Sequence, residues 1–217
     1  MKSVVVAAIL VYSMLVRVAP LPDLSMPARV YYNSNLTYGT TSSIKYYLEC
    51  MDYDVSLGAN PSEANLLAAF GSNMVLHMLG HGSPGSHQIY YNGSVAGSLI
   101  ANEVYAEYSD TSLSNLRLAF LEGCKTGASS SANGTYPDVL EDLGVDASIS
   151  FEDVIEAVTA TDGIHNFARQ VYYYLYGGRT VQAAVYQARA VLYDAENWYA
   201  GSEYVVIRGG STRIYSN

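Results

Sequence analysis

Two short runs of the chain are apolar at nearly every position, and they limit the fold more than any other feature of the sequence. Asn73–Leu79 is apolar from Met74 onward except at His77, and Leu116–Leu121 is apolar except at Arg117. Neither run alternates between apolar and polar residues, as a strand with one face in water does. Such runs are typical of strands that are buried on both faces, which occur in mostly parallel sheets.

Helical and strand patterns alternate along the rest of the chain. This order predicts an α/β fold with three layers, in which helices cover both faces of a mostly parallel central sheet. Asn92-Gly93 predicts a tight hairpin between Gln88–Tyr91 and Ser94–Ile100. The other predicted strands are Ala28–Tyr32, Tyr53–Leu57, Asp146–Ser150 and Tyr204–Arg208, and the predicted helices are Thr41–Met51, Pro61–Phe70, Tyr136–Leu143, Asp162–Tyr176 and Thr180–Tyr193.

Composition and charge exclude several classes of protein. Half of the 217 residues are hydrophobic, which rules out a disordered chain, and only 14% are charged. A formal net charge of −9 argues against binding to nucleic acid or anionic lipid and favours basic partners. Two cysteines are too few for a disulfide scaffold or a cysteine-rich zinc site.

The first 27 residues are expected to precede the folded domain. Lys2 is followed by the apolar run Val4–Val16, which is shorter than a membrane span, and then by a Pro-rich stretch. This pattern predicts a signal peptide that is cut after a small residue, Ala19 or Ala28, and therefore a secreted or cell-surface protein without stable membrane insertion. The alternative is that Val4–Val16 is a buried strand of a cytoplasmic protein. Residues 28–217 are predicted to form one domain.

His81 and Cys124 occupy equivalent places, just beyond the ends of the two apolar runs. Neighbouring parallel strands lie about 4.8 Å apart, and ligands bind at their carboxyl ends. We therefore expect the two side chains to face each other across a cleft, where a thiol and an imidazole are the minimum for nucleophilic acyl transfer. The backbone N–H groups of Gly82 and Cys124 are expected to form an oxyanion hole.

Each of the two residues also has a simpler explanation. A lone cysteine at a strand end is usually a small buried hydrophobe, and a histidine beside glycine is usually a loop residue. A disulfide between Cys50 and Cys124 is a further alternative in an exported chain. No zinc-ligand spacing, phosphate-binding loop or nucleophile elbow is present, so neither a metal nor a cofactor is expected.

Two blocks carry a resemblance to a known family. Leu-His-Met-Leu-Gly-His-Gly (76–82) resembles the His-Gly block of the caspase-like (clan CD) cysteine peptidases. Leu-Ala-Phe-Leu-Glu-Gly-Cys-Lys-Thr-Gly (118–127) resembles their strand-then-Cys block, in the form found in CHAT domains. The resemblance covers roughly residues 28–210, and the export pattern is more similar to that of clostripain and gingipains. Gly123 and Lys125 depart from the CHAT pattern, which has Ala before the cysteine and often Glu after it.

The resemblance implies the caspase-like fold and a cysteine endopeptidase. Cys124 would be the nucleophile, His81 its acid–base partner, and His77 a supporting residue. His87 and His165 have no place in the family pattern and are expected to be surface or capping residues.

The resemblance also implies a substrate preference. In clostripain-like relatives an acidic residue two positions before the cysteine lines the pocket for the residue that precedes the cut, and Glu122 has that place. Glu152 or Asp153 would supply a second acid, so cleavage after Arg or Lys is expected. The alternative is that Glu122 forms an internal salt bridge with Lys125 or Arg117.

Two other functions stay open at this point. One is a non-catalytic caspase-like module that is exported and binds partners through its Tyr-rich surface. The other is a transpeptidase or ligase that uses the same thioester, since hydrolase and ligase differ only in the access of water.

Overall fold

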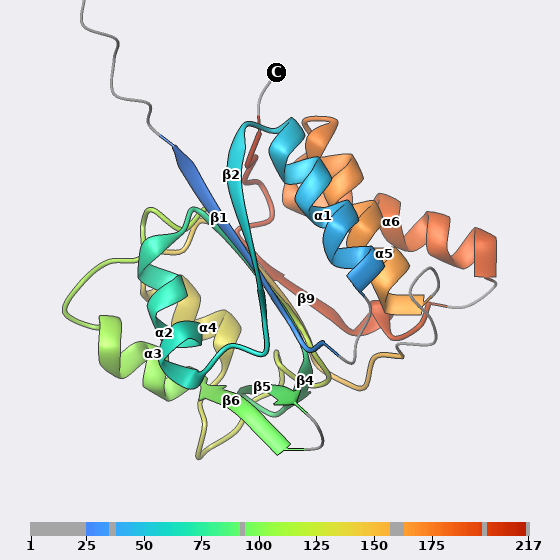
Figure 1. The fold of residues 1–217 in the computed structure, drawn as a ribbon. Helices are drawn as coiled ribbons and strands as arrows, with labels where there is room; N and C mark the ends of the chain where they lie inside the picture. The colour runs from blue at the N-terminus through green and yellow to red at the C-terminus, as the bar shows by residue number, and fades with distance from the viewer. Residues whose placement is uncertain (1–24, 35–37, 92–93, 157–162, 197–198, 216–217) are drawn as a thin grey trace, which may run out of the picture.

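A computed structural model describes residues 25–34, 38–91, 94–156, 163–196 and 199–215 (Figure 1). Its central sheet has six strands in the order β2-β1-β3-β7-β8-β9. β9 runs antiparallel to β8, and the other neighbours pair in parallel. The strands are β1 (Met26–Tyr32), β2 (Tyr53–Ala59), β3 (Val75–Leu79), β7 (Leu118–Glu122), β8 (Ser148–Phe151) and β9 (Val205–Arg208).

Helices cover both faces of this sheet, as Figure 1 shows. One face packs against α1 (Tyr38–Cys50), α5 (Gly163–Tyr176) and α6 (Val181–Glu196), and the other against α2 (Glu63–Ser72), α3 (Ala101–Tyr108) and α4 (Tyr136–Asp142). Every residue of β3 and β7 is buried. The predicted three-layer α/β/α fold with a mostly parallel sheet is therefore confirmed.

Alternate residues of β7 point to opposite faces of the sheet. Leu118 and Phe120 belong to the core beneath α1, α5 and α6, whereas Ala119 and Leu121 belong to the core beneath α2, α3 and α4. Glu122 continues the first of these two series, because side chains alternate along a strand. The sequence therefore aims a carboxylate at the α5 side of the sheet.

A second, smaller sheet lies at the carboxyl edge of the central one. β4 (His81–Ser83), β5 (Ser86–Tyr91) and β6 (Ser94–Ile100) pair in antiparallel fashion. The hairpin of β5 and β6 was predicted, although its Asn92-Gly93 turn lies outside the described residues. His81 was expected just beyond a strand end, and it is in fact the first residue of β4, where it pairs with Gln88.

α3 was not predicted from the sequence. It follows β6 without any turn residue between them, and the carboxylate of Glu103 accepts a hydrogen bond from the Ile100 N–H at 2.9 Å. Only Ala101 and Val104 are buried in this helix. With only two buried positions, the apolar pattern of this helix is too weak to distinguish it from the preceding strand.

Most of the predicted leader lies outside the described residues, which begin at Ser25. However, Met26–Ala28 pair with Tyr53–Val55 inside the sheet, and Ala28 is buried. A cut after Ala28 would remove these three residues from β1, whereas a cut after Ala19 would leave the strand whole. Export itself stays a prediction. Among the described residues, no helix is long and apolar enough to span a membrane.

His87 was expected at the surface and is instead buried. Its Nε2–H donates to the Met78 carbonyl at 3.1 Å, and its Nδ1 has no partner. Burial is the main reason why its pKa falls from 6.5 to about 4, because a second ring proton would find no acceptor. The neutral imidazole is therefore the form that fits the fold.

This pKa predicts an acid-sensitive fold. The unfolded chain binds the proton of His87 near pH 6.5 and the folded chain only near pH 4. His87 therefore destabilises the protein as the pH falls through this window, by up to about 3 kcal/mol.

We expect His87→Gln, which keeps a donor for Met78, to lose correspondingly less stability between pH 7 and pH 4 in urea denaturation. His81→Gln, which changes an exposed histidine, serves as the control and should follow the unmodified protein. Identical pH curves for His87→Gln and the unmodified protein would contradict this account.

Candidate active site

The site lies where β3 and β7 end side by side. Leu79 and Glu122 are register partners, and the Gly80 N–H donates to the Glu122 carbonyl at 3.0 Å. His81 lies two residues after Leu79, and Cys124 lies two residues after Glu122. Parallel pairing therefore brings the two predicted functional residues to the same edge of the sheet, although they are far apart in sequence.

The backbones that carry His81 and Cys124 touch each other. A Cβ at Gly82 would lie 2.2 Å from the Cys124 carbonyl oxygen, and a Cβ at Gly123 would lie 3.1 Å from the His81 carbonyl oxygen. Only a residue without a side chain allows the contact at Gly82. CHAT domains have Ala at the position of Gly123. Here the methyl group of Ala would crowd the His81 carbonyl, which explains why this chain has glycine.

His81 and Cys124 line one small pocket, which we call the nucleophile pocket. Its volume is about 120 Å³, and its lining residues are Leu79, Gly80, His81, Glu122, Cys124, Ile155, Ile164 and His165. Cys124 is half-buried and its Sγ lies 3.6 Å from the Ile155 carbonyl oxygen. Cys50 and Cys124 are both free, so the alternative disulfide is absent.

Hydrogen bonds hold the turn after Cys124 in place. Thr126 is buried, and its hydroxyl donates to the Leu121 and Gly123 carbonyls at 2.9 and 3.0 Å. Lys125 has a left-handed backbone with φ of 57°, and its N–H donates to the Asp153 carbonyl at 3.0 Å. These bonds fix the position of Cys124 between the end of β7 and the loop after β8.

A buried carboxylate in the floor of the pocket contacts two histidines. Glu122 is 1% exposed. The His165 Nδ1–H donates to its Oε1 at 2.7 Å, and His77 Nε2 lies 3.1 Å from its Oε2. The His77 contact is an ion-pair distance without the alignment of a hydrogen bond. On its other side, His77 Nδ1 lies 3.3 Å from the Tyr172 hydroxyl.

The charges of this cluster follow from its contacts. Burial alone would raise the pKa of Glu122, but the hydrogen bond and charge of His165, together with the close contact of His77, outweigh burial and lower it. Burial alone would lower the pKa of His165, but the hydrogen bond and charge of Glu122 raise it. Both shifts favour a Glu122 carboxylate paired with a His165 imidazolium near neutral pH.

The positions of these residues correct two expectations. His165 was expected to be a surface or capping residue; it lies in the first turn of α5, but it is buried there against Glu122. The salt-bridge alternative for Glu122 named the wrong partners. Lys125 pairs with Asp153 at 3.6 Å, and Arg117 donates to the carbonyls of Arg213 and Ile214. Glu122 is paired, but with histidines.

Among the described residues, no pocket brings Glu122, Glu152 and Asp153 together. Glu122 lies in the floor of the nucleophile pocket, while Glu152 is exposed and does not line that pocket. Asp153 lines a neighbouring hollow of about 380 Å³, which we call the acidic pocket. Its lining residues are Asp153, Val154, Glu156, Tyr199, Ala200, Gly201, Glu203 and Tyr204.

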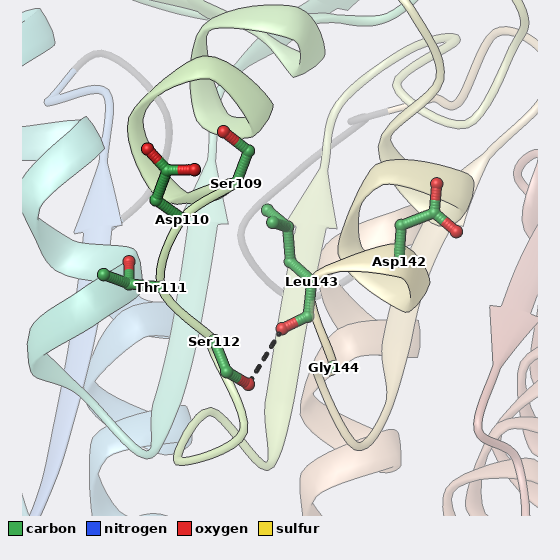
Figure 2. Close-up of a pocket in the computed structure, with 7 residues that line it drawn as sticks. All are labelled: Ser109, Asp110, Thr111, Ser112, Asp142, Leu143 and Gly144. Atoms are coloured by element: carbon green, nitrogen blue, oxygen red, sulfur yellow. Dashed lines mark hydrogen bonds between the residues drawn. The ribbon is translucent and has the colours of Figure 1, made fainter.

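A further hollow lies at the opposite edge of the sheet, between the ends of α3 and α4 (Figure 2). It contains Asp110 and Asp142, and the Ser112 hydroxyl donates to the Leu143 carbonyl. It has no thiol or imidazole among its lining residues. Within the described part of the chain, no group of three or more His, Cys, Asp or Glu residues could hold a metal ion.

Comparison with known proteins shows which fold this chain resembles. No family model and no curated relative matches the chain. Among solved structures, Saccharomyces cerevisiae separase in its complex with securin matches with a TM-score of 0.52 and 18% sequence identity. The match covers 85% of this chain. Separase is a caspase-like cysteine peptidase. The fold is caspase-like.

This likeness concerns the fold alone, because the sequence identity is low. The chain spans only 12% of the length of the separase chain. The predicted caspase-like fold is confirmed. The narrower resemblance to CHAT domains, clostripain and gingipains has no match in these comparisons and stays a prediction.

Proposed function

We propose that this protein is a cysteine endopeptidase with Cys124 as the nucleophile and His81 as the acid–base residue. The observation that carries the proposal is the shared pocket: both side chains line it at the carboxyl edge of a caspase-like sheet. A strand end beside a cleft is where α/β folds bind ligands. The floor of the same pocket holds a charged pair, Glu122 and His165, which is unusual in a purely structural core.

The reaction would proceed through a thioester. The Cys124 thiolate attacks the carbonyl carbon of the peptide bond, and the C–N bond breaks as His81 donates a proton to the leaving amine. Water then attacks the thioester, releases the new carboxyl terminus and returns the thiol. The N–H groups of Gly82 and Cys124 are proposed to hold the oxyanion, since the close backbone contact at Gly82 leaves no room for a side chain.

We also propose a preference for Arg or Lys before the cut. The acidic pocket supports it, because Asp153, Glu156 and Glu203 line a hollow large enough for a long side chain. This hollow adjoins the nucleophile pocket, since Val154 and Glu156 flank Ile155, whose carbonyl contacts Cys124. The net charge of −9 would help to attract basic segments.

A panel of fluorogenic peptides that differ only in the residue before the cut tests the function and the preference together. We expect peptides ending in Arg or Lys to be cleaved with a kcat/KM about tenfold or more above peptides ending in Leu or Asp. The double variant Asp153→Asn/Glu203→Gln should raise KM for the Arg peptide several-fold and leave the Leu peptide unchanged. Glu152→Gln is the matched control, because Glu152 is exposed and lines neither pocket.

Two results would count against the proposal. Equal cleavage of the Arg, Leu and Asp peptides would refute the assignment of the acidic pocket while leaving the peptidase intact. No cleavage of any peptide would favour the non-catalytic module.

A further inference from the structure

The inference concerns His165, a buried imidazole that the dyad of Cys124 and His81 does not use. His165 stands at the first turn of α5 and lines the nucleophile pocket together with Cys124. The pocket is small, about 120 Å³ in volume, and His81, Cys124 and His165 all line it. Two imidazoles, His81 and His165, therefore share one small space with one thiol.

Glu122 determines how His165 can act. Its Oε1 accepts the Nδ1–H of His165 at 2.7 Å, which fixes the ring and leaves only Nε2 for other contacts in the pocket. A carboxylate behind an imidazole both orients the ring and stabilises its charged form. The arrangement is buried, so water screens the charge of His165 only weakly.

We infer that His165, held by Glu122, is a positioning residue that stabilises the thiolate of Cys124. A thiolate next to a cationic side chain forms at lower pH than an isolated thiol, whose pKa is about 8.5. His81 is thereby left to protonate the leaving amine, because it is not needed as the sole counter-charge of the thiolate. This inference rests on the proposed role of Cys124 as nucleophile.

The other titratable groups around the pocket are few. His81 from β4 lines the same space, and Lys125, which follows Cys124, is paired with Asp153. Glu156 is exposed and reaches α5 through its carbonyl, which accepts the Ile164 N–H at 3.0 Å. Arg169 on α5 donates to Asn166. None of these groups duplicates the contact between His165 and Glu122.

The pH dependence of Cys124 alkylation by iodoacetamide tests the inference without any substrate. The experiment uses the full chain with Cys50→Ser, so that Cys124 is the only thiol, and measures the midpoint of the rate profile. We expect His165→Gln and Glu122→Gln each to raise this midpoint by one pH unit or more, which lowers the thiolate fraction about tenfold at pH 6.

His77→Gln is the matched control for disturbance of the buried cluster. His77 also contacts Glu122 and is fully buried, but it does not line the nucleophile pocket. We expect the midpoint for His77→Gln to stay within a few tenths of a unit of the parent protein. An unchanged midpoint in His165→Gln, or equal shifts in His165→Gln and His77→Gln, would overturn the inference.

A second measurement keeps the inference testable where variants of the buried cluster fail to fold. Coupling between two titrating groups is reciprocal, so the thiolate must also raise the pKa of His165. We expect NMR titration of the histidine rings to give His165 a pKa about one unit lower in Cys124→Ser than in the protein with its thiol. Equal values would refute the coupling. Because neither experiment measures cleavage, a failure here is distinguishable from a failure of the proposed peptidase function.

Discussion

Replacing Cys124 with alanine is expected to abolish peptide cleavage while leaving the fold unchanged. The thiol is the proposed site of covalent bond formation, and no other described side chain of the nucleophile pocket carries sulfur. The substitution removes one half-buried atom and keeps the contacts of Thr126 that support the turn. Initial rates on the preferred peptide, together with thermal unfolding of both proteins, measure the two effects separately.

Cys50→Ala is the control for this prediction. Cys50 lies at the end of α1, and it is a free thiol like Cys124. Its replacement should leave the cleavage rate unchanged. Full activity in Cys124→Ala, or loss of activity in Cys50→Ala, would show that the nucleophile has been assigned to the wrong residue.

Replacing His81 with alanine is expected to lower kcat/KM by roughly 10²–10⁴, the range for loss of an acid–base group. The effect should be smaller than that of Cys124→Ala, because the thiol can still attack without an acid to protonate the leaving amine. His81 is exposed at the start of β4, so the substitution should cost little stability.

His87→Ala is not a suitable control for His81, because His87 is buried and its loss would affect folding. His81→Gln is a second test variant, since glutamine keeps polarity and size at an exposed position but cannot act as the acid. Activity in His81→Gln equal to that of the unmodified protein would contradict the role of His81 as acid.

Much of the fold could be predicted because its central strands have an unambiguous pattern. The apolar runs that became β3 and β7 lack the alternation of an exposed strand, so they placed a parallel sheet at the centre of the fold. The parallel pairing of these strands then brings His81 and Cys124 to one edge. Local sequence determines where each strand ends. For this reason the edge of the sheet that carries the site could be predicted.

The floor of the pocket could not be predicted, because it depends on contacts between distant segments. His165 reaches Glu122 across 43 positions of sequence, and only the packing of α5 on the sheet brings them together. A single histidine in an amphipathic helix carries no signal of such a partner. The one available hint was Glu122 itself, because a carboxylate in a strand buried on both faces needs an opposite charge.

The acidic residues show the limit of reasoning by family resemblance. Glu122 has the expected place in sequence, yet both of its carboxylate oxygens lie beside histidines. Asp153 is near the site but lines a different hollow, together with Glu203 from η1 (Ser202–Tyr204). Position in a motif fixes the direction of a side chain, whereas its partners depend on residues from other parts of the chain.

The most direct test of the central claim is to locate a covalent adduct. The full chain is treated with a peptidyl acyloxymethyl ketone that ends in Arg, and the modified residue is identified by mass spectrometry of the digested protein. We predict one adduct per chain, on Cys124, that forms at a rate lowered by competing substrate and that is absent from Cys124→Ser. An adduct on Cys50, or no adduct under conditions in which the protein is folded, would contradict the assignment of Cys124 as the nucleophile of a cysteine peptidase.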